Sequence, residues 1–221
     1  TPTTSPEDFV SQAEALAVQG KYTQALQQYQ QALRADPRNP DYYIAMARLN
    51  IFSGNYADAV INASNALLLD NTSSLAETLK GFGLAFTGDY LQGEASLNRA
   101  IELDPSNASA YAYLAILYAQ QIINGQGAIS NLDKAIEASR KALTFAPGTL
   151  ETHWARGLVL EITSNYEDAI AEFEAAVAQN PNITELHMAL GRNYRSLQKY
   201  DRAVEEFTRA SALNPTDPNP A

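Results

Sequence analysis

One amphipathic phrase recurs through the chain, and its clearest copy covers residues 164–181, with the sequence SNYEDAIAEFEAAVAQNP. Apolar residues spaced by three and four form a single stripe along a helix in this segment. These residues are Tyr166, Ala169, Ile170, Phe173, Ala176 and Val177. One such helix cannot bury its own stripe, so the copies have to pack against one another. The recurrence therefore constrains the fold more than any other feature of the sequence.

The period of the repeat is 34 residues, seen first in the turn tyrosines Tyr22, Tyr56 and Tyr90, and again between Tyr166 and Tyr200. An alanine recurs in every copy of the following helix, and a proline closes most copies. The alanines are Ala32, Ala66, Ala100, Ala142, Ala176 and Ala210, and the prolines are Pro37, Pro105, Pro147, Pro181 and Pro215. Six units follow, at residues 6–39, 40–73, 74–107, 108–149, 150–183 and 184–217. Residues 1–5 are predicted to be a linker, and residues 218–221 a solvated tail.

Each unit is predicted to be a helix–turn–helix, with a glycine or alanine where its two helices cross. These small residues are Ala13, Ala47, Gly81, Ala115, Gly157 and Gly191. Together with the 34-residue period, they make the chain resemble the tetratricopeptide repeat family over about 212 of its 221 residues. The resemblance implies an all-α, right-handed superhelical solenoid of six repeats and about twelve helices. The first helices of the repeats would line its concave face.

The fourth unit is eight residues longer than the others, and the extra residues begin near Ile122 and Ile123. Either the first helix of this unit runs on by about two turns, or a glycine-containing loop protrudes from the array. Most insertions of this kind are tolerated surface loops. The functional alternative is that Ile122 and Ile123 contact a ligand, the groove wall or another subunit.

The composition narrows the classes of partner. The net charge of −10 argues against nucleic acid and anionic membrane surfaces as partners. Apolar residues are never continuous over the roughly 18 positions that a membrane-spanning helix needs, so direct membrane insertion is not expected. The chain has no cysteine, which excludes disulfides and thiolate metal sites. We expect no cofactor, and the compartment stays open between cytoplasmic and extracytoplasmic.

Catalysis finds little support in the sequence. His153 and His187 occupy the same position of successive repeats, and a zinc site would need Glu151 and Glu185 as further ligands. Packing histidines are the favoured interpretation, so no metal site is predicted. The acidic residues of the last two second helices are expected to form a solvated face. They are Glu167, Asp168, Glu172, Glu174, Glu205 and Glu206. Neither a phosphate-binding loop nor a nucleophile elbow occurs, so the chain is not expected to be an enzyme.

In the tetratricopeptide family, fixed positions of the first helices face the groove, and the resemblance carries these positions over to this chain. The predicted groove residues are Ile44, Arg48, Phe52, Thr78, Phe82, Phe86, Ile116, Trp154, Leu158, Met188, Arg192 and Arg195. Apolar side chains on a concave surface mark recognition sites. The hypothesis is that an extended or helical partner segment lies there, anchored near Phe82 and Trp154. The alternative is that half of these residues pack between adjacent first helices.

The predicted function is protein–protein interaction without chemistry. Chaperone-binding members of the family hold a C-terminal carboxylate with lysines and asparagines, but the matching positions here are Val10, Glu14 and Ala45. Binding of chaperone tails is therefore not predicted. Two alternatives remain: an adaptor or assembly segment of a longer membrane-tethered or enzymatic protein, and a self-associating scaffold that uses the insertion. The expected state is a monomer or weak homodimer.

Overall fold

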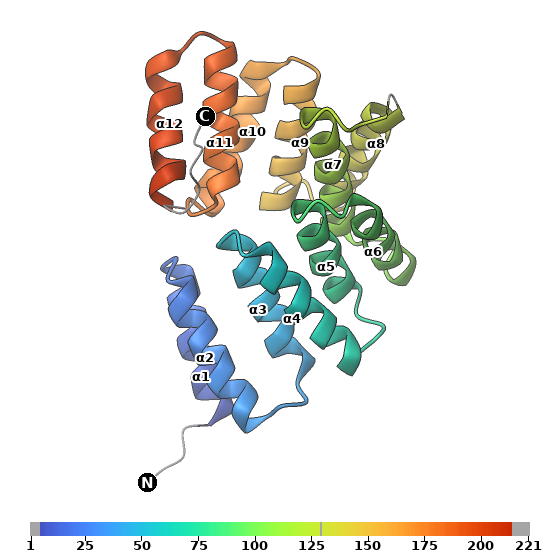
Figure 1. Cartoon of the computed structure of the whole chain (residues 1–221), viewed down its shortest axis with the longest axis vertical. Coiled ribbons are helices and arrows are strands. Elements are labelled where there is room, and N and C mark those ends of the chain that lie inside the picture. The colour runs from blue at the N-terminus through green and yellow to red at the C-terminus, as the bar shows by residue number, and fades with distance from the viewer. Residues whose placement is uncertain (1–4, 129, 214–221) are drawn as a thin grey trace. The chain divides into compact units, whose positions relative to one another are not determined.

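A computed structural model describes residues 5–128 and 130–213 of the chain. Most of the predicted linker, the predicted tail and Pro215 lie outside these residues. The described residues form twelve α-helices, paired as six helix–turn–helix units (Figure 1). The all-α architecture predicted from the sequence is confirmed.

Contacts between helices divide the chain into two compact units, which we call unit 1 (Thr1–Leu103) and unit 2 (Asp104–Ala221). The division falls between α6 and α7, at the end of the third helix pair. Unit 1 contains α1 (Pro6–Val18), α2 (Tyr22–Ala35), α3 (Pro40–Phe52), α4 (Tyr56–Leu69), α5 (Ser74–Phe86) and α6 (Tyr90–Leu103). Unit 2 contains α7 (Ala108–Ile123), α8 (Ser130–Phe145), α9 (Leu150–Ile162), α10 (Tyr166–Gln179), α11 (Thr184–Ser196) and α12 (Tyr200–Leu213). The single continuous array stays a prediction.

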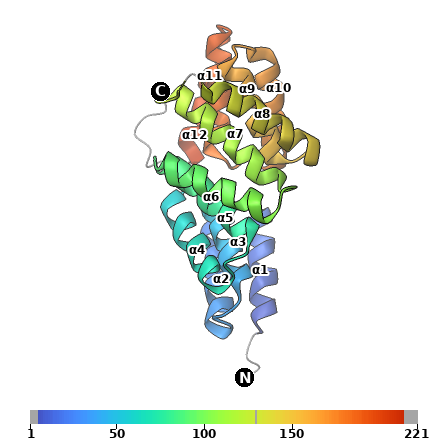
Figure 2. The ribbon, with the colours of Figure 1, turned by 90° about the vertical axis from the view of Figure 1, so that its right-hand side faces the viewer.

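Within each unit the pairs stack in chain order (Figure 2). In unit 1, α5 packs on α4 and α3, and in unit 2, α9 packs on α7 and α8. Each pair thus covers the apolar stripe of the pair before it, which is how a repeat too small to fold alone becomes stable.

The two helices of a pair approach closely where the small crossing residues lie. A Cβ atom added at Gly81 would come within 2.7 Å of Leu97, and one added at Gly157 within 2.6 Å of the Phe173 ring. Both distances are shorter than any ordinary carbon–carbon contact. Glycine is therefore required at these crossings because a large side chain fills the facing position.

Side-chain caps fix where several first helices begin. Ser5 and Asp8 form a capping box at the start of α1. Asn107 accepts a hydrogen bond from the Ala110 amide at the start of α7, and Thr149 does the same for Thr152 at α9. These caps stabilise the first turns of the three helices and define the residues at which they begin.

The insertion in the fourth unit extends both helices and leaves a short loop between them. α7 and α8 have 16 residues each, against 13 in α1 and 14 in α2. Residues 124–128 of the connection are exposed, and Gly125 has a φ of 68°. Each of the two sequence alternatives therefore holds in part, because helix extension and an exposed glycine turn share the extra residues.

Candidate functional site

Five of the predicted groove residues lie in the core. Thr78, Phe82 and Ile116 are 0% exposed, and Trp154 and Leu158 are 2% exposed. A side chain without accessible surface cannot touch a partner unless the fold rearranges. Phe82 and Trp154 therefore pack inside their units, and the predicted anchoring of a partner at these two residues is not compatible with their burial.

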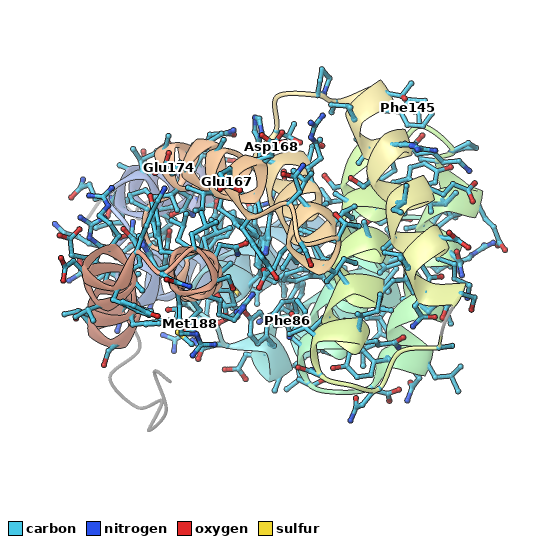
Figure 3. The ribbon with its side chains drawn as sticks, turned by 90° about the horizontal axis from the view of Figure 1, so that it is seen from above. Phe86, Phe145, Glu167, Asp168, Glu174 and Met188 are labelled. Atoms are coloured by element: carbon cyan, nitrogen blue, oxygen red, sulfur yellow. The ribbon has the colours of Figure 1, made fainter. Side chains whose placement is uncertain are left out.

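The remaining predicted residues keep surface. Arg48 and Arg195 are exposed, and the others are half-buried, namely Ile44, Phe52, Phe86, Met188 and Arg192. In unit 1 these residues lie on α3 and α5, and in unit 2 on α11. Figure 3 labels Phe86 and Met188 among the side chains of these helices.

In unit 1, tyrosines of the preceding second helix pack against the half-buried phenylalanines. The ring centroids of Phe52 and Tyr22 lie 6.1 Å apart. Phe86 stacks on Tyr56 at 4.6 Å and lies 4.7 Å from Phe82, so these three rings form one aromatic cluster. A phenylalanine ends both α3 and α5, with a tyrosine behind it in each case.

The phenol of Tyr29, on α2 of unit 1, is affected by burial and by charges of both signs. Burial raises the pKa of its phenol, and the negative charge of Glu14 raises it further, while Arg48 acts in the opposite direction. Glu14 and Arg48 therefore act on the same phenol from two different first helices. The charge of Arg48 therefore acts on an aromatic side chain of unit 1 that an acidic residue also affects. Arg195 lies on α11, in unit 2.

Unit 2 contains a pocket of about 320 Å³ where the first helices end. Its walls include Ile122 and Ile123 of α7, Glu161 and Ile162 of α9, and Arg192 and Arg195 of α11. The pocket joins two features that the sequence presented separately, the insertion in the fourth repeat and the basic residues of the sixth. We refer to it below as the isoleucine–arginine pocket.

An ion pair fixes one side of this pocket. The guanidinium of Arg192 donates from Nε to Glu161 Oε1 at 2.7 Å and from Nη2 to Oε2 at 3.0 Å. This two-point geometry is the most directional that arginine makes with a carboxylate. Arg192 is thereby neutralised and held still, and Arg195, one turn further along α11, is exposed to solvent.

Both histidines pair with glutamates of the following helix. His153 Nδ1 lies 2.7 Å from Glu172 Oε2, and Glu172 also pairs with Arg156 at 2.8 Å. His187 Nδ1 lies 2.6 Å from Glu206 Oε2, and His187 Nε2 lies 3.0 Å from the carbonyl oxygen of Pro181. The histidines thus hold one helix of a pair to the other.

The prediction that all six acidic residues form a solvated face is wrong for two of them. Glu206 is only 4% exposed, and Glu172 is half-buried. Glu167, Asp168 and Glu174 do lie along the outer side of α10 (Figure 3), although Glu174 also accepts a hydrogen bond from the Tyr194 hydroxyl at 2.8 Å. A sequence signal existed, because each histidine precedes its glutamate by 19 residues in both repeats.

Tyr194 shows the same coupling between neighbouring helices of unit 2. Burial raises the pKa of its phenol, and the hydrogen bond to Glu174 raises it further. Among the residues that the structure describes, no group of three or more histidine or acidic side chains could hold a metal ion. No described helix combines the length and the apolar character needed to cross a bilayer.

Three family models match the chain, and together they reach both units. One described as "TPR repeat" matches residues 13–50, and two described as "Tetratricopeptide repeat" match residues 96–137 and 150–218. Among curated proteins, the chain is 32% identical over 95 residues to a protein SGT1 homolog of Oryza sativa subsp. japonica, covering 43% of this chain and 26% of the relative. It is 26% identical over 145 residues to the human DnaJ homolog subfamily C member 7, covering 64% of this chain and 29% of that protein. The chain thus spans less than a third of these relatives' length.

Solved structures show the same fold. The crystal structure of MamA protein aligns with a TM-score of 0.53 and 24% identity, covering 80% of this chain and 92% of that one. A human IFIT1 dimer with m7Gppp-AAAA aligns with a TM-score of 0.70 and 21% identity, covering 96% of this chain and 51% of that one. At these identities the likeness concerns the helical architecture alone.

Proposed function

The chain belongs to the tetratricopeptide repeat family, and we propose that it binds a segment of a partner protein along the inward side of its first helices, without catalysis. The repeats and the related proteins support a role as a protein-interaction scaffold.

The observation that carries the proposal is the pair of half-buried phenylalanines in unit 1. Phe52 and Phe86 end successive first helices, and each keeps surface while a tyrosine packs behind it. A ring braced in this way loses little side-chain freedom when a partner covers it, so little entropy opposes binding. Aromatic side chains at the centre of an interface contribute most of its binding energy.

In unit 2 the corresponding surface is made by α11. Met188 is half-buried and Arg195 is exposed, so this helix presents one apolar and one basic side chain, while Arg192 is paired with Glu161. Methionine adapts to irregular partner surfaces, and arginine donates several hydrogen bonds in a fixed plane. These properties suit a peptide or helix of another protein.

The charge of the chain argues for a protein partner over nucleic acid. A net charge of −10 repels a phosphate backbone at long range. The human IFIT1 dimer was solved with m7Gppp-AAAA, but at 21% identity the likeness to it concerns the fold alone. Since the chain spans less than a third of its curated relatives, a role as the adaptor segment of a larger protein is consistent with the same binding surface.

Photo-crosslinking in cells of the source organism tests the proposal. A photoreactive phenylalanine analogue placed at Phe52 or Phe86 should form an adduct with a partner protein. The matched control is the same analogue at Leu91, which is 81% exposed on the second helix α6. The adduct should be absent there, because α6 is not a first helix. Phe86→Ala should weaken partner binding about tenfold, the loss expected for one aromatic anchor.

Two results would contradict the proposal. One is an adduct at Leu91 as strong as those at Phe52 and Phe86, which would move the interface to the outer helices. The other is unchanged partner affinity in a Phe52→Ala and Phe86→Ala double variant whose circular dichroism matches that of the parent chain.

A further inference from the structure

The isoleucine–arginine pocket of unit 2 has the size of a specificity site. Its volume of about 320 Å³ lies at the lower end of the roughly 300–1,000 Å³ typical of ligand pockets. A space of this size admits one or two side chains of an extended segment and is too small for a helix. The pocket can therefore bind one or two particular side chains within a longer partner segment.

The apolar wall of the pocket comes from the insertion. α7 is three residues longer than the 13-residue helices α9 and α11, and Ile122 and Ile123 lie in this added turn. Ile162 of α9 also lines the pocket and is half-buried, as are the two α7 isoleucines. Three branched aliphatic side chains that keep surface in one pocket favour an aliphatic side chain as the occupant.

The charge of the pocket is carried by Arg195. Glu161 and Arg192 neutralise each other through their two hydrogen bonds. For Arg195 we find no acidic partner among the residues that the structure describes, and its side chain lines the same pocket. An exposed cation beside an apolar wall, in a chain of net charge −10, complements a carboxylate at that one position.

We propose that the isoleucine–arginine pocket binds a short acidic segment within a partner protein, in which an aliphatic side chain stands next to an aspartate or glutamate. Ile122, Ile123 and Ile162 hold the aliphatic side chain, and Arg195 holds the carboxylate. Arg192 does not bind the segment directly, because its charge is already paired with Glu161 through two hydrogen bonds. This inference rests on the proposed function and adds to it the sequence chemistry that the partner has to present.

The inference also assigns a role to the insertion. Without the added turn of α7, the pocket would have Ile162 as its aliphatic wall and Arg195 as an isolated surface charge. An isolated surface ion pair contributes about 0–1 kcal/mol, whereas an adjacent apolar contact excludes water from the pair and adds its own burial. The insertion thus places an apolar wall beside a surface arginine, so that the pocket can bind an aliphatic side chain and a carboxylate together.

The test uses the whole chain with methyl-labelled isoleucine, observed by NMR, and a defined peptide probe. The probe is Gly-Asp-Leu-Gly, acetylated at its N-terminus and amidated at its C-terminus. We expect saturable shifts of the Ile122, Ile123 and Ile162 methyl signals, while Ile44 of unit 1 stays unchanged. Replacing the probe's aspartate with asparagine, or its leucine with alanine, should each weaken binding at least about fivefold.

Protein variants separate the charge from the fold. Arg195→Gln should weaken probe binding at least about fivefold, and Arg195→Glu should reverse the preference toward a Gly-Lys-Leu-Gly probe. Arg140→Gln, which removes an exposed arginine from α8 of the same unit, should leave binding unchanged. Both sites are exposed, so neither substitution should alter the thermal unfolding of the chain.

Several outcomes would overturn the inference. Equal binding of the aspartate and asparagine probes removes the role of Arg195, and so does wild-type affinity in Arg195→Gln. A Gly-Gly-Leu probe with a free C-terminal carboxylate that binds as tightly as the blocked probe overturns the assignment to an internal segment. If the probe shifts none of the three methyl signals while Phe86 still crosslinks a partner, the pocket inference fails and the proposed function stands. Loss of the specific crosslinks at Phe52 and Phe86 contradicts the proposed function whatever the probe does.

Discussion

Unit 1 and unit 2 close their helix pairs with the same backbone turn, but the last two pairs of unit 2 have no glycine in it. The left-handed residue of the turn is Gly20, Gly54 and Gly88 in unit 1, with φ between 71° and 89°. In unit 2 the first pair keeps a glycine, Gly125 with a φ of 68°, but Ser164 and Gln198 adopt the same conformation in the other two pairs, with φ of 63° and 59°. The stacking of the pairs therefore imposes the turn, and a residue with a Cβ atom is tolerated there at a cost of about 1–2 kcal/mol.

The two units also differ in the side-chain contacts that join their helices. Unit 1 joins neighbouring helices through the aromatic cluster of Tyr56, Phe82 and Phe86. Unit 2 joins the helices of its last two pairs through His153–Glu172 and His187–Glu206. Ring packing depends on the volume of each side chain, whereas a buried polar pair depends on both partners being present. The two units should therefore respond differently to truncation.

The largest expected effect is the loss of Phe82 from unit 1. Phe82→Ala removes a fully buried ring and leaves a cavity, which costs about 3–5 kcal/mol of unfolding free energy. Urea unfolding followed by far-ultraviolet circular dichroism reports all helices, while the fluorescence of Trp154, the one tryptophan of the chain, reports unit 2. We expect the destabilisation in the circular dichroism and a smaller change in the fluorescence, because a repeat interacts with its immediate neighbours.

Phe86→Ala is the matched control for Phe82→Ala. Phe86 belongs to the same aromatic cluster but is half-buried, so its loss should cost distinctly less stability. Equal costs for the two variants would mean that Phe86 is as much a core residue as Phe82. In that case the surface proposed for partner binding in unit 1 would lose one of its two anchors.

The second prediction concerns the buried glutamate of unit 2. Glu206→Ala leaves Nδ1 of the buried His187 without its partner, which costs about 1–3 kcal/mol. Glu205→Ala, one residue earlier and exposed, should change stability by less than about 0.5 kcal/mol. Both variants lose one negative charge, so the difference between their unfolding midpoints isolates the histidine contact. Equal midpoints would mean that the His187–Glu206 contact contributes no more to stability than an exposed surface residue does.

The regular part of this fold could be predicted from the sequence because it depends on local patterns. The 34-residue period located the helix pairs, and the small residues located the crossings that Gly81 and Gly157 form in the structure. Turn positions followed from the glycine–tyrosine pattern even where Ser164 and Gln198 replaced glycine. In each case the residues that determine the geometry lie within one repeat.

The candidate site was less predictable because it depends on contacts between repeats. Phe82 and Trp154 occupy positions that the repeat pattern predicts to face a groove, but their side chains are completely or almost completely buried. The acidic pattern of α12 placed Glu205 and Glu206 together, and only the position of His187 on α11 separates the buried one from the exposed one. The residue pattern along one helix predicts which face a side chain lies on. Whether that side chain is buried depends on the residues of the neighbouring helix that pack against that face.

The smallest expected effect returns to the turns. Gln198→Gly should stabilise unit 2 by about 1 kcal/mol, because glycine adopts a positive φ without the Cβ contact that glutamine makes. Gly54→Gln should destabilise unit 1 by a similar amount, because it creates in unit 1 the turn that unit 2 tolerates. Urea unfolding of both variants gives the two shifts, with Gly148→Ala as a control at a glycine that has open space around it. Opposite shifts would show that the two units share one turn geometry with one intrinsic cost. A Gln198→Gly variant no more stable than the parent would mean that the glutamine side chain makes a compensating contact in unit 2, and the two turns would then be alike in backbone but not in energy.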